Sequence, residues 1–185
     1  MNEVLKTIAD RYSCRDFETT PLTEEQIKSL VEAALASPSA RNEQPWQVIV
    51  VTDKKLIEEL DADGVRILSE MEDKTYYERV SARGGKMLYD APCLIMIASN
   101  GSEYADIDCG ILTQSLTLAA HSIGLGSVVI GLLKIPLAGP RGDEFKKRMN
   151  FPEGYGFGIS VLVGTVKSGK EPHELDMSKV TYIKG

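Results

Sequence analysis

Apolar residues at helical spacing mark the first element that the sequence predicts. Thr23-Glu24-Glu25-Gln26 forms a capping box, and apolar side chains then recur every three or four residues until Pro38 ends the pattern. This spacing predicts a helix over about 24–36. Asp53 can cap a second, short helix that carries Leu56, Ile57 and Leu60. A long helix is expected over 106–123 and a short one over 145–149, whereas the mixed, charged segment 62–90 predicts short helices with a mobile loop.

Four apolar runs predict strands, at 47–52, 93–99, 127–130 and 158–166, and the first two are expected to be buried. Helices and strands interleave without βαβ repeats, which favours an α+β sheet flanked by helices over a doubly wound fold. The residues from 167 onward show neither pattern and predict a C-terminal arm. Because no repeat or linker divides the chain, 1–185 is predicted to be a single domain.

Composition and charge narrow the class of protein. The chain has 185 residues, of which 43% are apolar, enough for a core of its own. Its 21 Lys+Arg against 27 Asp+Glu give a net charge of -6, which argues against a nucleic-acid groove. Three cysteines without CxxC spacing, and a start without an apolar signal-like run, indicate a reducing cytoplasm and predict no disulfide framework and no metal site.

The uncharged stretch from 110 to 133 is long enough to raise the question of a membrane span. Several hydroxyl and amide side chains interrupt it, and Gly124-Leu125-Gly126 breaks it into two elements. We therefore expect an uncharged helix followed by a buried strand, and no membrane association. A helix that is apolar on most sides needs cover beyond its own sheet, which a dimer partner could supply.

Arg11-Tyr12-Ser13-Cys14-Arg15 carries the strongest candidate chemistry, with two guanidinium groups and a hydroxyl at every second position. Alternate side chains of an extended segment point the same way, so all three could converge on one phosphate. In a helix, Ser13 would point away from both arginines. The prediction therefore depends on an extended backbone, and two surface arginines beside a helix end remain the alternative interpretation.

The sequence lacks the phosphate loop GxxxxGK[ST], the zinc motif HExxH and the nucleophile elbow GxSxG. Gly124-Leu125-Gly126 follows a helix and precedes a strand, the reverse of a dinucleotide fingerprint, so we interpret it as a helix stop. His121 is interpreted as a core or interface residue, and His173 as solvated. With so few bases and nucleophiles, a bound cofactor is expected to carry any difficult chemistry.

A loop between a helix and a strand adds a second motif, Ser37-Pro38-Ser39-Ala40-Arg41-Asn42-Glu43-Gln44-Pro45-Trp46. It offers short hydroxyls, two amides and exposed backbone between two prolines. Together with Arg11 to Phe17, this loop resembles the nitroreductase family of FMN-dependent NAD(P)H oxidoreductases. The likeness continues through Asp90-Ala91-Pro92 and through 118–131, and it thins at 61–85 and after 165.

The resemblance implies an α+β fold with a mixed or antiparallel central sheet, forming an interlocked homodimer with FMN at the interface. Each site would be built from both chains. Arg11 and Ser13 would hold the FMN phosphate, and Tyr12 would add a backbone contact. Arg15 would reach the ribityl chain or the pyrimidine edge of the flavin.

The resemblance also assigns residues to the flavin ring. The backbone of Ile130 and Gly131 would approach the ring near N5 and O4, and a missing Cβ at Gly131 would permit a close approach. Lys86 stands about where the family can place a cation near the flavin O2. The partner chain would line the other side of the cofactor with Pro38, Ser39, Ala40 and Asn42.

The chain departs from the family pattern after its last strand. Gly164-Thr165-Val166-Lys167 replaces a common Gly-Tyr-Pro, and the later arginine that completes the phosphate clamp is missing. Lys167, Lys170 and His173 are the candidates to replace it, and we choose Lys170. The chain also lacks the long helical insertion of larger members, so its substrate class stays open.

The resemblance implies a ping-pong reaction in which NADH or NADPH transfers a hydride to the flavin N5. A small acceptor such as a nitroaromatic or a quinone is then reduced on the same face. Arg15, with Lys86, would tune the flavin electrostatically. The alternatives are a reductive dehalogenase or ene-type reductase with a narrower reaction, a non-catalytic flavin-binding sensor or interaction module, and an α+β domain without cofactor. The sequence does not choose between NADH and NADPH, and it does not identify the physiological acceptor.

Overall fold

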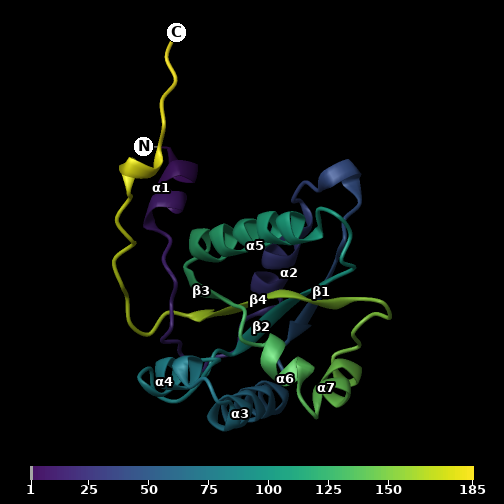
Figure 1. Cartoon of the computed structure of the whole chain (residues 1–185). Helices are drawn as coiled ribbons and strands as arrows, with labels where there is room; N and C mark the ends of the chain where they lie inside the picture. The colour runs from purple at the N-terminus through teal and green to yellow at the C-terminus, as the bar shows by residue number, and fades with distance from the viewer. Residues whose placement is uncertain (1) are drawn as a thin grey trace.

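The computed structural model describes residues 2–185 as three layers, with a four-stranded sheet between two sets of helices (Figure 1). α2 (Glu24–Leu35) and α5 (Ala105–Ser122) cover one face. The other face carries α3 (Lys54–Glu70), α4 (Thr75–Ser81), α6 (Lys134–Ala138) and α7 (Gly142–Arg148). The remaining helices are α1 (Glu3–Asp10) and the 3-10 turns η1 (Ala40–Asn42) and η2 (Met177–Lys179). The α+β architecture predicted from the sequence is confirmed.

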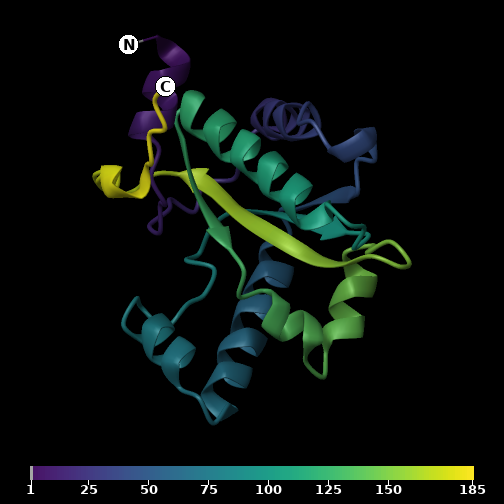
Figure 2. The same cartoon turned by 45° about the horizontal axis from the view of Figure 1, so that its top comes forward.

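The strands are β1 (Trp46–Val51), β2 (Cys93–Ser99), β3 (Leu125–Ile130) and β4 (Gly156–Thr165), in the spatial order β1-β2-β4-β3. All three strand pairs are antiparallel, and the long strand β4 runs through the middle of the sheet (Figure 2). A single parallel bridge joins Ser13 to Ser127 of β3. The N-terminal segment is thereby attached to the free edge of β3.

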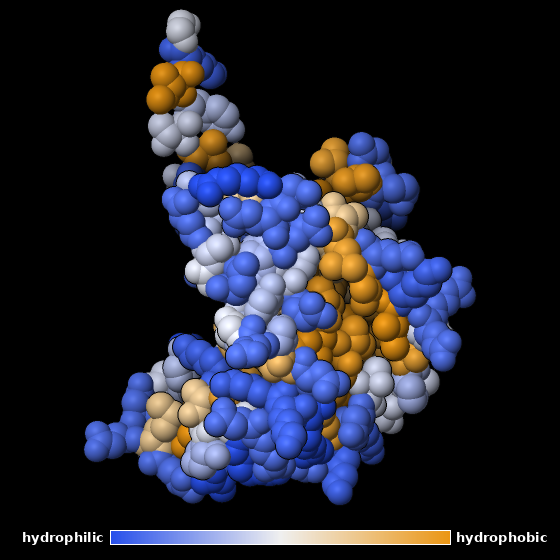
Figure 3. All heavy atoms as spheres, turned by 90° about the vertical axis from the view of Figure 1, so that its right-hand side faces the viewer, coloured by the Kyte–Doolittle hydropathy of each residue, from blue (hydrophilic) through white to orange (hydrophobic). Residues whose placement is uncertain are grey.

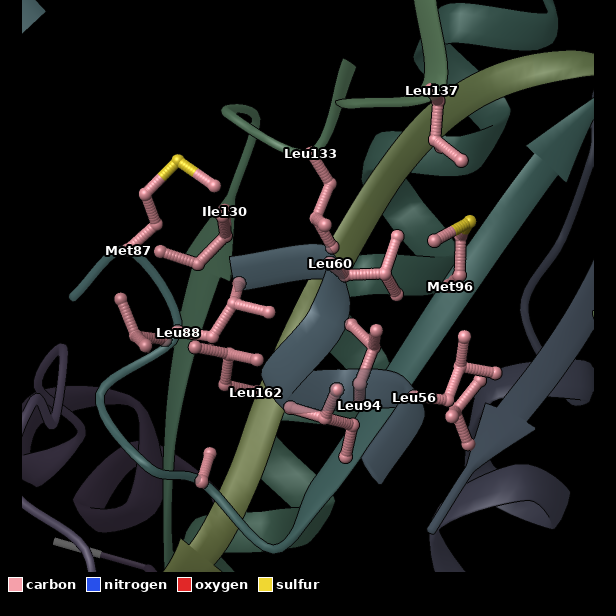
Figure 4. Close-up of a cluster of buried hydrophobic side chains, with 14 of the residues drawn as sticks. Leu56, Leu60, Met87, Leu88, Leu94, Met96, Ile130, Leu133, Leu137 and Leu162 are labelled. Carbon is pink, nitrogen blue, oxygen red and sulfur yellow. The ribbon is translucent and has the colours of Figure 1, made fainter. Parts of the chain in front are cut away.

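Side chains alternate between two cores along the central strands. Ile95 and Ile97 of β2 point to the layer of α2 and α5, whereas Leu94 and Met96 point to the layer of α3. Figure 4 shows the second core, in which Leu60 of α3 meets Leu94 and Leu162. Because both faces of the sheet are covered, every residue of β2 is buried, as predicted from its unbroken apolar run.

The predicted capping box is confirmed at the start of α2. The Thr23 hydroxyl accepts from the Gln26 backbone N–H at 3.2 Å, and the Gln26 side chain accepts from the Thr23 N–H at 2.9 Å. These reciprocal bonds satisfy two donors that a helix start leaves without partners. The helices predicted over 24–36, 106–123 and 145–149 all exist, with ends shifted by up to three residues.

The short helix predicted after Asp53 is wrong in length, because α3 continues to Glu70 and replaces part of the expected mobile loop. Asp53 does cap it, accepting from the backbone N–H groups of Lys55 and Leu56. Gly64 stands inside the helix because the Met87 Cε atom would lie 2.0 Å from a Cβ there. The glycine therefore allows close packing and does not mark a helix end.

One further prediction needs correction, and one helix was not predicted. β1 is not fully buried, since it forms an edge of the sheet and its four inner residues are partly or fully exposed. α6 was not anticipated, because Pro136 sits inside a five-residue helix. None of the helices within residues 2–185 combines the length and apolar character needed to cross a bilayer.

Candidate functional site

Residues 11–15 are extended, as the proposed phosphate site requires. Arg11 ends α1 with φ -63° and ψ 132°, and the Cys14 N–H donates to the Ser127 carbonyl at 2.9 Å. This hydrogen bond and the Ser13–Ser127 bridge align the segment along β3. The condition of an extended backbone is therefore met. The alternative of two surface arginines beside a helix end is not tested by this geometry, because Arg11 directly ends α1 and Arg15 is exposed.

Gly126 of β3 makes this alignment possible. A Cβ at Gly126 would lie 2.8 Å from the Cys14 Cβ, 2.9 Å from its Sγ and 2.7 Å from the Val166 Cγ2. These are closer than real side chains approach. Gly124 has φ +79° and ends α5, so the interpretation as a helix stop holds for Gly124. Gly126 instead provides room for the segment that carries the candidate site.

Ser13, Arg15 and Lys170 line one cavity of about 270 Å³. Arg15 and Lys170 are exposed, and the Arg15 Nη1 makes only a long contact of 3.4 Å to the Ser13 carbonyl. Arg83 and Tyr89 line the same cavity. The cavity thus has three cationic residues and a hydroxyl against one acidic residue, Asp16, and this donor set is suited to a phosphate.

The C-terminal arm reaches this cavity through contacts with Asp16. The Lys167 N–H donates to the Asp16 carbonyl at 3.0 Å, and the Ser168 Oγ donates to the Asp16 Oδ2 at 2.6 Å. Burial raises the pKa of Tyr12, and a hydrogen bond from the Lys170 backbone opposes part of this shift. Together these contacts hold residues 167–170 beside 12–16, which explains how Lys170 joins the cavity.

Arg11 lines a neighbouring, smaller cavity of about 170 Å³ with His121, Gly124 and Gly126. Tyr12 borders both cavities. The structure thus brings Ser13 and Arg15 to one cavity and places Arg11 on the other. The role predicted for Arg11 at the phosphate stays a prediction.

The loop predicted to line the cofactor is held by a buried carboxylate. Both oxygens of Asp108, which is 3% exposed, lie 3.1 Å from the Ala40 N–H. The Ser39 Oγ accepts from the Gln44 N–H at 2.9 Å, and Arg41, Asn42 and Gln44 all have φ between 47° and 55°. A backbone held in this sparsely populated region is typical of functional loops.

This loop and the candidate phosphate cavity are separate within one chain. Pro38, Ser39, Ala40 and Asn42 line neither the cavity of Ser13 and Arg15 nor the neighbouring cavity of Arg11. The loop instead contacts the start of α5, where Arg41 pairs with Glu103 at 3.0 Å and lies 5.9 Å from the centre of the Tyr104 ring. A single copy therefore does not bring the two predicted halves of the site together.

The residues predicted to face the flavin ring lie at the end of β3. The Ser160 Oγ donates to the Ile130 carbonyl at 2.6 Å, which fixes the backbone there. Gly131 borders a cavity of about 750 Å³, and a Cβ on Gly131 would meet only the Ile159 Cδ1, at 3.9 Å. The backbone is thus accessible from the side of this cavity.

Lys86 forms an ion pair with Asp90, whose Oδ2 lies 2.6 Å from the Nζ, and it does not line the cavity of Ser13 and Arg15. The pairing raises the pKa of Lys86. Asp61 accepts from the backbone N–H groups of Met87 and Leu88 at 2.7 and 2.8 Å, although burial raises its pKa. The role predicted for Lys86 near the flavin O2 stays a prediction.

The cysteines offer no reactive thiolate. Cys14, Cys93 and Cys109 are free and buried, and burial raises the pKa of Cys93 to about 12. Burial also raises the pKa of Cys14 and of Cys109. Because the thiolate is the nucleophilic form, covalent cysteine catalysis is not supported.

Residues 8–165 match the sequence profile of the Nitroreductase family. The chain belongs to the nitroreductase family. It is 30% identical over 185 residues to a putative NADH dehydrogenase/NAD(P)H nitroreductase of Archaeoglobus fulgidus, covering 95% of this chain and 92% of the relative. A nitroreductase of Desulfitobacterium hafniense DCB-2, solved with bound FMN, is 45% identical, with a TM-score of 0.96 and full coverage of both chains. An iodotyrosine deiodinase of Thermotoga neapolitana is 30% identical over 157 residues, 78% of this chain and 77% of the relative.

Sequence reasoning missed Arg83 and Tyr89, which this nitroreductase-family chain places in the candidate phosphate cavity. Both lie in the segment 62–90, where the hydrophobic pattern was weakest. Tyr89 and Asp90 have φ of 51° and 53°, in the left-handed region that non-glycine residues rarely adopt. Such a turn depends on tertiary contacts, so no local signal identified it.

Proposed function

We propose that this member of the nitroreductase family is an FMN-dependent oxidoreductase that uses NADH or NADPH to reduce small conjugated acceptors. Nitroaromatics and quinones are the acceptor classes we favour. The observation that carries the proposal is the convergence of Ser13, Arg15 and Lys170 on one cavity. We further propose that residues 1–185 act as one FMN-binding domain in the cytoplasm.

The cavity suits the FMN phosphate in charge and in donor type. Guanidinium groups and a hydroxyl donate hydrogen bonds to phosphate oxygens, and an ammonium adds a point charge. Arg15 and Lys170 are both exposed, and none of the ion pairs within residues 2–185 includes either side chain, so both charges are available to a ligand. Lys170 thus replaces the missing C-terminal arginine, and Arg83 supplies a cation that the family motifs did not indicate.

FMN held here would supply the hydride-transfer chemistry at N5. The nicotinamide donor and the acceptor would use one open face in turn, and the kinetics would then be ping-pong. The chain's own contribution is positioning. The Ser160 hydroxyl holds the Ile130 carbonyl, so that the backbone of Ile130 and Gly131 is fixed where the ring would lie. Arg15 would stabilise negative charge that develops on the pyrimidine side of the ring.

A homodimer is part of the proposal, because one chain separates the loop at 38–42 from the phosphate cavity. Exposed apolar side chains support a homodimer, because a partner chain could cover them. Ile107 and Ile111 of α5 are 62% and 38% exposed. The arm after β4 extends away from the body (Figure 1), and its Tyr182 and Ile183 are 69% and 96% exposed. Figure 3 shows a further apolar patch bordered by hydrophilic side chains. Surfaces of this kind are typical of protein interfaces.

The direct test is an anaerobic titration of the purified, FMN-loaded protein with NADH and with NADPH. We expect rapid bleaching of the flavin by at least one donor, followed by reoxidation with a nitroaromatic or a quinone. A flavin that neither donor reduces would reject the enzymatic proposal and favour a flavin-binding sensor or interaction module. A protein that stays colourless after FMN is added would reject the cofactor itself.

Reductive dehalogenation is a second candidate, favoured by the similarity to the Thermotoga neapolitana iodotyrosine deiodinase. Both functions would use the same cofactor site and differ in the acceptor. Incubating the reduced protein with 3-iodotyrosine, and in parallel with a nitroaromatic, distinguishes them. Release of iodide at a rate above that of nitroaromatic reduction would favour the dehalogenase.

A further inference from the structure

The cavity of about 750 Å³ beside Gly131 is lined by both apolar and charged side chains. It opens between β4 and the helices α6 and α7, which lie side by side beneath the sheet (Figure 2). Phe157 of β4 and Leu137 of α6 give it apolar surface, and Tyr76 of α4 borders it. A planar ligand could therefore lie against apolar and aromatic side chains on reaching Gly131.

Two lysines also line this cavity, Lys134 at the start of α6 and Lys146 in α7. Lys134 forms no ion pair with any residue from 2 to 185, and the nearest carboxylate oxygen to the Lys146 Nζ is that of the exposed Asp143, at 3.9 Å. Asp106 is the single acidic residue in the wall. The cavity thus presents two ammonium groups against one carboxylate.

The position of Lys146 is fixed by the contacts of α7. Arg141 and Arg148, at the two ends of the helix, donate to the Glu59 carboxylate of α3 at 2.9 and 2.7 Å. Phe145 is fully buried, and the Arg141 guanidinium lies 4.5 Å from the centre of its ring. α7 is therefore held against α3, and the next residue, Lys146, is directed to the cavity by a rigid element.

We propose that Lys134 and Lys146 bind an anionic group on a planar ligand that reaches the flavin face at Gly131. This inference rests on the proposed function, which places the flavin beside Ile130 and Gly131. The anion has two possible sources, a carboxylate on the acceptor or a phosphate on the nicotinamide donor. Both present oxygen acceptors that two ammonium groups recognise in the same way.

The first experiment measures equilibrium binding and needs no turnover. Benzoate, and benzamide as its neutral counterpart, are titrated into the oxidised FMN-loaded protein by calorimetry. Lys134→Gln and Lys146→Gln should each weaken benzoate binding about fivefold and leave benzamide unchanged, as expected for the loss of one partly exposed charge contact. Asp106→Asn should have the opposite effect and tighten benzoate binding.

The second arm compares NADP⁺ with NAD⁺ in the same variants, since only NADP⁺ carries the additional phosphate. A selective loss of NADP⁺ affinity assigns the lysines to the donor, and a selective loss of benzoate affinity assigns them to the acceptor. Lys147→Gln is the matched control, because Lys147 is exposed on the same helix and does not line the cavity. Its affinities should equal those of the wild type.

Two affinity ratios decide the outcome, that of benzoate to benzamide and that of NADP⁺ to NAD⁺. The inference is overturned if Lys134→Gln and Lys146→Gln leave both ratios at the wild-type value. Lys134→Arg and Lys146→Arg keep the charge and should retain the ratios, which separates a charge effect from a packing effect. Failure of the proposed function is recognised separately. In that case NADH and NADPH leave the flavin absorbance unchanged, whereas the calorimetric ratios depend only on binding.

Discussion

Gly126→Ala tests whether the segment 11–15 needs its close contact with β3. The added Cβ would lie 2.7–2.9 Å from atoms of Cys14 and Val166. The Cys14 Cβ cannot rotate away from it, so the backbone of the segment has to move by several tenths of an ångström. Overpacking of this kind costs about 1–3 kcal/mol. Because Ser13 and Arg15 flank Cys14, the same displacement disturbs the candidate phosphate cavity.

The assay combines thermal unfolding of the apoprotein with an FMN titration followed by flavin fluorescence. For Gly126→Ala we expect a Tm lower by roughly 5 °C and FMN binding weaker by about tenfold. Gly156→Ala is the matched control, since a Cβ at Gly156 has no atom within 4 Å. If Gly126→Ala bound FMN as the wild type does, the segment beside β3 would not be the phosphate site.

Two further predictions concern the scaffold around the site. The hydrogen bonds from Arg148 and Arg141 lower the pKa of Glu59 from 4.5 to about 2. The ionised carboxylate therefore stabilises the fold above pH 4.5, and this stabilisation is lost as the pH falls towards 2. The stability advantage of the wild type over Glu59→Gln, measured by urea unfolding, should therefore disappear between those pH values; an advantage independent of pH would contradict it. Asp108→Ala leaves the Ala40 N–H without its buried acceptor and should lower the free energy of unfolding by about 2 kcal/mol, whereas Asp108→Asn keeps an acceptor and should lose less. Equal losses in chemical denaturation would show that the hydrogen bond is not the cause.

Local chemistry explains what the sequence predicted correctly. The capping box at Thr23 and Gln26 specifies the start of α2 through contacts three residues apart, independent of the rest of the fold. The alternation of arginine and serine at 11–15 predicted three side chains on one ligand, because an extended backbone places alternate residues on one side. Ser13 and Arg15 do line one cavity, whereas Arg11 lines another. Lys170 was chosen from three candidates for the missing cation. The structure places it on the same cavity as Ser13, and its role at a phosphate stays a prediction.

The predictions from the sequence fail where contacts between distant parts of the chain determine the local structure. Gly64 weakens the helical pattern of α3, yet Met87, far along the chain, occupies the space that a side chain would need. An apolar run such as that of β1 does not tell an edge strand from a central one, because burial depends on which strands pair. Arg83 reaches the cavity through the turns that follow α4, and Asp61 holds the backbone of Met87 and Leu88 nearby. No periodicity encodes such a contact.

Comparing FMN with riboflavin tests the central claim most directly, because riboflavin lacks only the phosphate. Both are titrated into the apoprotein, in the wild type and in Ser13→Ala and Lys170→Gln. We predict that the wild type binds FMN more tightly than riboflavin, and that each variant reduces this preference about tenfold while riboflavin binding stays unchanged. Equal affinity of the wild type for the two ligands, or a preference that both variants retain in full, would contradict a phosphate site at Ser13, Arg15 and Lys170.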